Sequence, residues 1–165
     1  MATERVTRIQ LQALIATLEA YLPSALVAVT LPSPGEWVVD QAEPHSGQCP
    51  YGVITVGTWT QAISTTARTI GGVGGAHVVR TTRFGVSIVD SHADRATLGL
   101  RVYDYADVLT AVLEEQWQLG LDGVRNSDVV SGGPAPPIPR ASRSGPYYRY
   151  AGVELVVTYQ RILGT

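Results

Sequence analysis

The sequence predicts an α+β fold: a mainly antiparallel sheet flanked by two helices, with a long hairpin flap and a proline-rich loop. Two stretches repeat apolar residues at spacings of three and four, as on the buried stripe of a helix. Other stretches alternate apolar and polar residues or are rich in β-branched ones, which is typical of strands. The length of 165 residues fits a single domain spanning residues 1–165.

The first helix is predicted over 4–22, where a leucine-rich stripe ends at Leu22. Thr3 is a suitable cap for its start, and Pro23 is expected to mark its end. An apolar run over 25–31 is then interpreted as a buried strand, stopped by the proline and glycine residues that follow. A further short strand is expected over 36–40.

The stretches 51–58 and 77–90 are rich in β-branched or alternating residues, so we expect them to form two strands that pair with each other. Between them lies a small, polar and glycine-rich segment, QAISTTARTIGGVGG. We predict that it forms a flap, over about 60–76, projecting from the sheet as the tip of an extended hairpin.

The second helix is predicted over 100–119, with Trp117 on its apolar stripe and Asp104 and Asp107 near its start. The segment 131–146, SGGPAPPIPRASRSGP, has little apolar mass, so we expect a long loop or arm. Strict alternation over 149–162 predicts the final strand.

Composition narrows the function classes. Nearly half of the residues are hydrophobic (45%), and the formal net charge is only −2, which disfavours bulk nucleic-acid binding. All basic residues are arginine, whose planar fork suits protein interfaces, although nucleotide composition explains this equally well. Cys49 is the only cysteine, which predicts a reducing compartment. We identify no signal peptide or membrane span, and expect a soluble protein.

One pattern points to a metal. Asp90, His92 and Asp94 alternate, so on an extended segment their side chains would share one face and approach an ion together. The alternative is a polar turn between the long strand and the second helix. This triad supports a second hypothesis for the whole chain, a small metal-binding or enzyme domain; otherwise we expect no cofactor and no catalytic residue.

Other candidate sites are weaker. The GGVGG sequence lacks the following helix and Lys-Ser or Lys-Thr pair of a phosphate loop. Cys49 has no nearby histidine-bearing motif, and Glu114 and Glu115 diverge on a helix. Pro136, Ile138 and Pro139 fit a polyproline segment, a linker, or an arm that interlocks with a neighbouring subunit.

Four motifs carry a family resemblance: CPYGVITVG, RTTRFGVSIVDSHAD, LRVYDYADVLTAVLEE and YRYAGVELVVTYQRI. In their order, the chain resembles the tail terminator and neck (head–tail joining) proteins of tailed bacteriophages. The resemblance implies a structural virion protein without catalytic residues, which forms a homohexameric ring that caps the tail tube or joins the tail to the head. The implied partners are other copies of the chain, tail-tube, sheath or head-connector proteins, with assembly in the host cytoplasm.

The resemblance also implies which surfaces meet neighbours: the sheet edges, the flap and the arm. DNA would pass through the ring without sequence-specific recognition. An exposed sheet edge must be covered in a soluble protein, and continuing the sheet into the next subunit does this. Five arginines are the candidate donors to carboxylates on adjacent subunits: Arg80, Arg83, Arg140, Arg143 and Arg149.

Overall fold

The computed structural model describes residues 5–40, 49–64, 76–138, 140 and 142–163, and it confirms the α+β fold. The elements are α1 (Val6–Ala28), β1 (Trp37–Val39), β2 (Tyr51–Ser64), β3 (Ala76–His92), α2 (Arg95–Glu115), β4 (Val124–Pro134) and β5 (Tyr147–Leu163). They form one five-stranded sheet with the order β1-β2-β3-β5-β4. Only the short β1–β2 pair is parallel.

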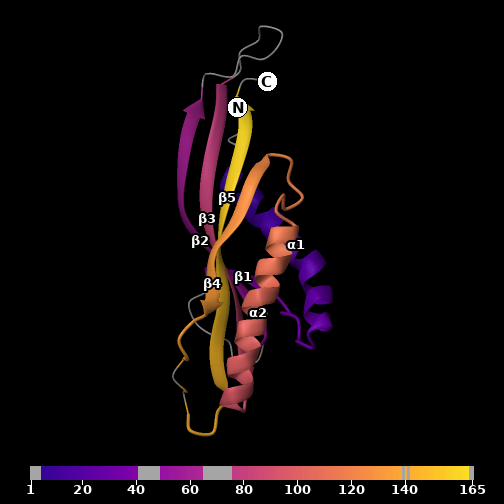
Figure 1. Cartoon of the computed structure of the whole chain (residues 1–165). Coiled ribbons are helices and arrows are strands. Elements are labelled where there is room, and N and C mark those ends of the chain that lie inside the picture. The colour runs from indigo at the N-terminus through magenta and orange to yellow at the C-terminus, as the bar shows by residue number, and fades with distance from the viewer. Residues whose placement is uncertain (1–4, 41–48, 65–75, 139, 141, 164–165) are drawn as a thin grey trace.

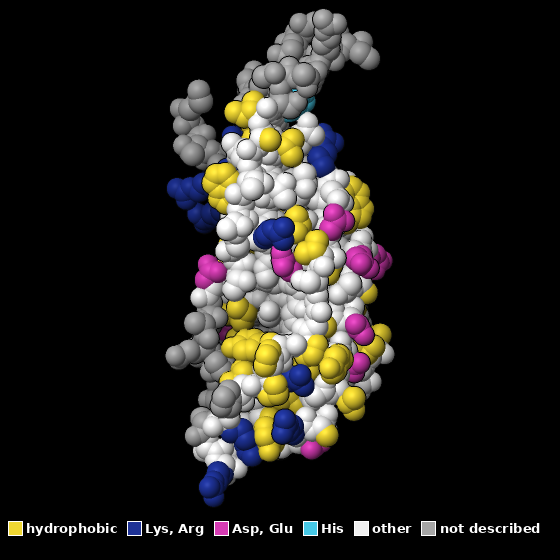
Figure 2. Space-filling model, turned by 60° about the vertical axis from the view of Figure 1, so that its left-hand side comes forward, with side chains coloured by type: hydrophobic (Ala, Val, Ile, Leu, Met, Phe, Trp, Pro, Cys, Tyr) yellow, Lys and Arg dark blue, Asp and Glu magenta, His cyan; other side chains and the backbone are white. Residues whose placement is uncertain are grey.

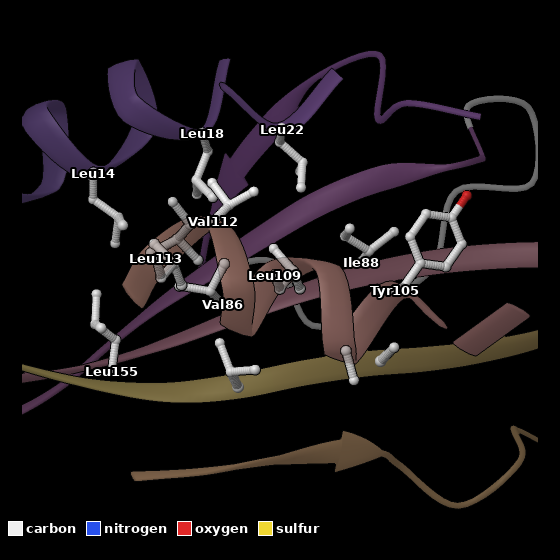
Figure 3. Packing of buried hydrophobic residues seen from close by; sticks show 14 of the residues in the cluster. Leu14, Leu18, Leu22, Val86, Ile88, Tyr105, Leu109, Val112, Leu113 and Leu155 are labelled. Carbon is white, nitrogen blue, oxygen red and sulfur yellow. The ribbon is translucent and has the colours of Figure 1, made fainter. Parts of the chain in front are cut away.

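Both helices lie on the same side of the sheet, and β2, β3 and β5 extend past them at one end of the molecule (Figure 1). The buried core therefore occupies the space between the helices and one sheet face. Leu14, Leu18 and Leu22 of α1 point toward Leu109 and Val112 of α2 and toward the strands (Figure 3). The hydroxyl of Tyr105, whose ring is buried, donates a hydrogen bond to the Pro32 carbonyl (2.8 Å), which ties α2 to the chain after α1.

The helix α1 is longer than predicted. It continues through Pro23 to Ala28, so the strand expected over 25–31 is wrong, as is the helix end at Pro23. A proline inside a helix costs roughly 3 kcal/mol. Leu26, fully buried, extends the stripe of Leu18 and Leu22, and burying such a side chain contributes about 1.5–3 kcal/mol. The predicted cap, Thr3, lies outside the described residues.

By length and composition alone, α1 is also apolar enough to cross a membrane, with a mean hydropathy of 1.4 over its best window. Helices in the cores of soluble proteins pass the same test, and the leucine stripe of α1 is buried against α2 and the sheet. The helix is amphipathic, with Arg8 and Glu19 exposed. One face of α1 packs on the core, with 28% of that window buried, and the absence of membrane association stays a prediction.

The second helix begins earlier than expected. Asp94 caps α2, with its Oδ2 accepting a hydrogen bond from the Thr97 amide (3.0 Å), and the helix ends at Glu115. The predicted start at residue 100 misses this cap, because Asp94 also fits a polar turn or the metal triad. Asp104 and Asp107 therefore lie in the middle of the helix and are exposed, and Trp117 lies beyond its end.

The predicted β2–β3 pairing is confirmed, and it reaches further than expected. Residues up to Ser64 pair antiparallel with β3, across a bulge between Val56 and Trp59. The flap predicted over about 60–76 is thus too long, because residues 60–64 and 76 belong to the strands. Its glycine-rich part, 65–75, lies outside the described residues.

The strand β4 was not predicted, and its last four residues fall inside the expected arm over 131–146. It pairs antiparallel with β5 across two irregularities, after Val124 and after Val129. The arm therefore begins at Ala135, whose amide donates to the Tyr150 carbonyl (2.9 Å), and Ile138 forms a bridge with Tyr148. The predicted strand over 149–162 is confirmed as β5, with alternate residues buried.

Candidate functional site: the open face and edges of the sheet

The three residues of the possible metal site have separate structural roles. Asp90 is buried, with one oxygen accepting the Ser91 amide (2.8 Å) and the other 2.9 Å from the Arg101 guanidinium. The Nδ1 atom of His92 accepts the Asp94 amide (2.9 Å), and the Asp94 carboxylate caps α2. Across the described ranges no three His, Cys, Asp or Glu side chains form a group that could hold a metal ion.

Asp90 instead belongs to a partly buried polar cluster between β3 and α2. Burial raises the pKa of Asp90, while Arg101, the Ser91 amide and His92 lower it. Burial, and then the nearby Asp90 charge, raise the pKa of Tyr105 to about 12. Burial likewise raises the pKa of the Cys49 thiol. Near neutral pH both remain protonated, so the cluster contains one carboxylate and one guanidinium, an arrangement that fixes α2 on the sheet.

The structure gives most of the candidate interface arginines a partner within the chain. Arg80 donates to Gln61 and Thr7, and its guanidinium lies 4.2 Å from the centroid of the Trp59 ring. Arg83 forms an exposed ion pair with Glu154 of β5.

The other three candidates lie in or beside the arm. Arg140 donates to the Tyr147 hydroxyl (3.0 Å) and lies over that ring, and Arg149 donates to the Ala135 carbonyl (3.0 Å). These contacts fold the described arm back onto β5. Arg143 is exposed.

The sheet face opposite the helices is open over much of its length. Small residues line a shallow hollow on it, including Ser87 of β3, Gly132 of β4 and Gly152 of β5. A Cβ at position 152 would lie 2.4 Å from the Ser87 hydroxyl oxygen, so glycine is the residue that fits there without a shift of Ser87. Figure 2 shows this side with few charged side chains in its middle and apolar ones gathered in its lower half. Tyr51, Val53 and Val89 form a second, smaller cluster of buried residues on the sheet.

Both lateral edges of the sheet expose backbone. The strand β1 covers only residues 52–54 of β2, and the Asp40 carboxylate accepts the next outward amide, that of Val56 (3.2 Å). Beyond it, β2 has no second strand partner among the described residues, up to Ser64. On the opposite edge, β4 pairs with β5 alone within the same part of the chain. An unpaired edge is a template for another strand.

The sequence did not predict the exposed aromatic residues and the groove beside these edges, which suit them to contacts with another protein. Trp59 on β2 is 50% exposed, and Trp117 beside β4 is 41% exposed. A groove also runs between α2 and β4, lined by Tyr103, Asp107 and Val130 among others. No spacing in the sequence separates Trp117 from the helix stripe, because Gly120, with a positive φ of 62°, lies four residues beyond the Gln116 cap and favours the predicted end at 119.

No protein-family model and no curated protein matches the sequence. Among solved structures, the chain is similar to one in the virion of a native gene transfer agent (GTA) particle. The two share 15% sequence identity with a TM-score of 0.41, over 88% of this chain and 90% of the other. A similarity of this size does not establish a common fold or function.

Proposed function

We propose that this protein is a structural subunit of a phage-like virion, forming a homo-oligomeric ring at the neck or at the head-proximal end of the tail. The ring, a hexamer in the family that the sequence resembles, would cap the tail tube or join the tail to the head. Its partners would be further copies of itself and the tail-tube, sheath or head-connector proteins. The protein would act without catalysis or a cofactor, first in the host cytoplasm and then in the virion.

The observation that carries this proposal is the one-sided sheet with two unpartnered edges. Among the described residues, helices cover one face, while part of the other face and much of both edges have no partner within the chain. A soluble protein that exposes strand edges must cover or disrupt them, and a ring covers every edge at once. Among the described residues, no cavity is lined by a cluster of side chains typical of a catalytic site. The buried Asp90 of β3 instead forms an ion pair with Arg101 of α2, which holds the helix on the sheet.

The character of the open face fits the lumen of such a ring. Gly85, Ser87 and Gly152 give it small side chains, and its central arginine, Arg83, is neutralised by Glu154. A surface with little net charge lets DNA pass without retaining it, since phosphate binding depends on unpaired basic residues. In this arrangement the helices face outward.

Native mass spectrometry of the purified protein, alone and mixed with the tail-tube protein encoded beside it, tests the proposal. We expect a single closed oligomer, and a ring with a central opening by negative-stain electron microscopy. A protein that stays monomeric at every concentration and does not bind tail-tube protein would contradict the proposal. A neighbouring tail-tube or sheath gene supports the assignment, whereas a metabolic operon contradicts it.

A further inference from the structure

The pairing registers place the two exposed tryptophans at the same level on opposite edges of the sheet. Trp59 pairs with Thr82, Thr82 with Val157, and Val157 with Ser127 of β4. The Ser127 hydroxyl donates to the Trp117 carbonyl (2.7 Å), so Trp117 lies beside that level. Thr82, Val157 and Ser127 are all buried, so this row belongs to the face that the helices cover.

The same counting aligns a whole segment. Val56 is level with Val129, through Phe84 and Leu155. Gln61 is level with Val124, through Arg80 and Tyr159. Residues 56–61, within the part of β2 that β1 leaves uncovered, therefore lie level with 124–129 on the outer edge of β4.

Strand direction also fits. Successive antiparallel pairs make β2 run with β5 and against β4. Copies related by rotation about an axis along the strands keep both direction and level. The uncovered segment of β2 from one copy would then meet β4 of the next as an antiparallel pair, the arrangement with well-aligned hydrogen bonds.

The β2 side carries positive charge. The Arg80 guanidinium lies over the Trp59 ring, and its Nη1 donates to the Thr7 hydroxyl (3.2 Å). This contact places the first turn of α1 beside the edge, where Arg5 and Arg8 are exposed. Nearer to β1, the Asp40 carboxylate accepts a hydrogen bond from the Val56 amide.

The β4 side carries negative charge. Glu114, Glu115 and Asp122 flank Trp117 in the sequence and are exposed. From residue 102 to residue 124 the chain has five acidic residues and no basic one, and β4 itself adds Asp128 and one exposed arginine, Arg125, whose side chain donates to Gln160 (2.9 Å). Each edge thus combines an exposed tryptophan with charge opposite to that of the other edge.

We propose that the uncovered β2 segment and Trp59 of one copy dock on β4 and Trp117 of the next copy. The contact joins two different surfaces, so repeating it gives a ring when the rotation closes. It rests on the proposed ring, and it specifies which surfaces build that ring. The arginines around Trp59 face the acidic residues around Trp117, which sets the direction of the contact.

Disulfide trapping tests the register. Thr60 is level with Asn126, through Thr81 and Thr158, and both are exposed. Within one chain they are three strand spacings apart, roughly 14 Å, beyond the reach of a disulfide. In a Cys49→Ser background, Thr60→Cys combined with Asn126→Cys should form disulfides between subunits on oxidation. A non-reducing gel should then show a ladder of linked oligomers that ends at the copy number of the ring.

A matched control checks the level. Ser131 is level with Thr55, through Glu154 and Gly85. Gly85 lies four residues along β3 from Thr81, the partner of Thr60, so the two levels are about 14 Å apart. Thr60→Cys with Ser131→Cys should give no ladder. An equal ladder from both pairs overturns the proposed register.

Removing the aromatic contacts supplies an independent measurement. Trp59→Ala and Trp117→Ala should each weaken subunit association on the order of 30-fold, as for a central aromatic contact. Val27→Ala, 72% exposed on α1, should not change association. If native mass spectrometry shows a ring but the cysteine pair gives no ladder and neither tryptophan variant weakens association, this interface is wrong and the proposed function still stands. A strict monomer without a ladder overturns both.

Discussion

Replacing Arg101 by methionine should destabilise the protein strongly above the pKa of Asp90 and weakly below it. The Arg101 guanidinium lies 2.9 Å from the Asp90 carboxylate, and the two side chains are 20% and 2% exposed. Removing one partner of a buried pair leaves an uncompensated charge and costs about 3–5 kcal/mol. The exposed part of Arg101 places the expected loss at the lower end, about 3 kcal/mol.

The pH dependence has a definite sign. Burial raises the pKa of Asp90 in the folded state, so the folded protein binds a proton more tightly than the unfolded one does. Wild-type stability therefore falls as pH rises from the unfolded pKa through the raised folded pKa. Arg101 opposes that rise, so the Arg101→Met variant should have a higher Asp90 pKa and a steeper fall.

Urea denaturation followed by circular dichroism, repeated between about pH 4 and pH 8, measures both effects. Arg101→Met combined with Asp90→Asn should recover much of the lost stability, because no buried charge remains. Arg95→Met, on the exposed first turn of α2, is the control and should change little. A loss in Arg101→Met that is the same at every pH, and that persists in the double variant, would refute the role given to the carboxylate.

Three further predictions concern the fold. Leu109→Ala removes a fully buried side chain and should cost about 2–5 kcal/mol in urea denaturation, whereas Leu100→Ala, 71% exposed, should stay within about 0.5 kcal/mol. Asp94→Ala should lower the melting temperature; hydrogen bonds from the first turn of α2 lower the pKa of Asp94, so the defect should shrink as pH falls through that pKa. Gly52→Ala should cost about 1–3 kcal/mol in the same urea assay, because its Cβ would lie 2.1 Å from a ring carbon of Trp37, and no loss would contradict that packing.

The strands with strict alternation were predictable. In β5, Val153, Leu155 and Val157 face the core and Glu154 and Val156 face away, so the two-residue period of the sequence is the period of burial. The long strand β3 and its pairing with β2 followed from the same signal. The end of β2 lies beyond the predicted residue 58. Gln61 and Ala62 have little β propensity, and they belong to the strand because they pair with β3.

The first helix shows where local signals fail. Pro23 and the apolar run after it favour a helix end followed by a strand. The stripe from Leu18 through Leu22 to Leu26 packs on α2, and this tertiary contact outweighs the local preference. The sequence contains the stripe, but only the packed core decides between the two patterns.

The candidate interface depends most on what the sequence did not predict. The segment of β4 contains Asn126, Ser127, Asp128 and two glycines, a composition typical of a loop, and it becomes a strand because the edge of β5 is open to pairing. Because α2 ends at Glu115, Trp117 does not lie on the predicted helix stripe. It lies beside β4 at the sheet edge, level with Trp59. Alignment of two exposed tryptophans across four strands is a property of register, which no spacing along the chain encodes, and oppositely charged surroundings make it directional. The interface therefore stands or falls with the register of β4, which the paired cysteines measure directly.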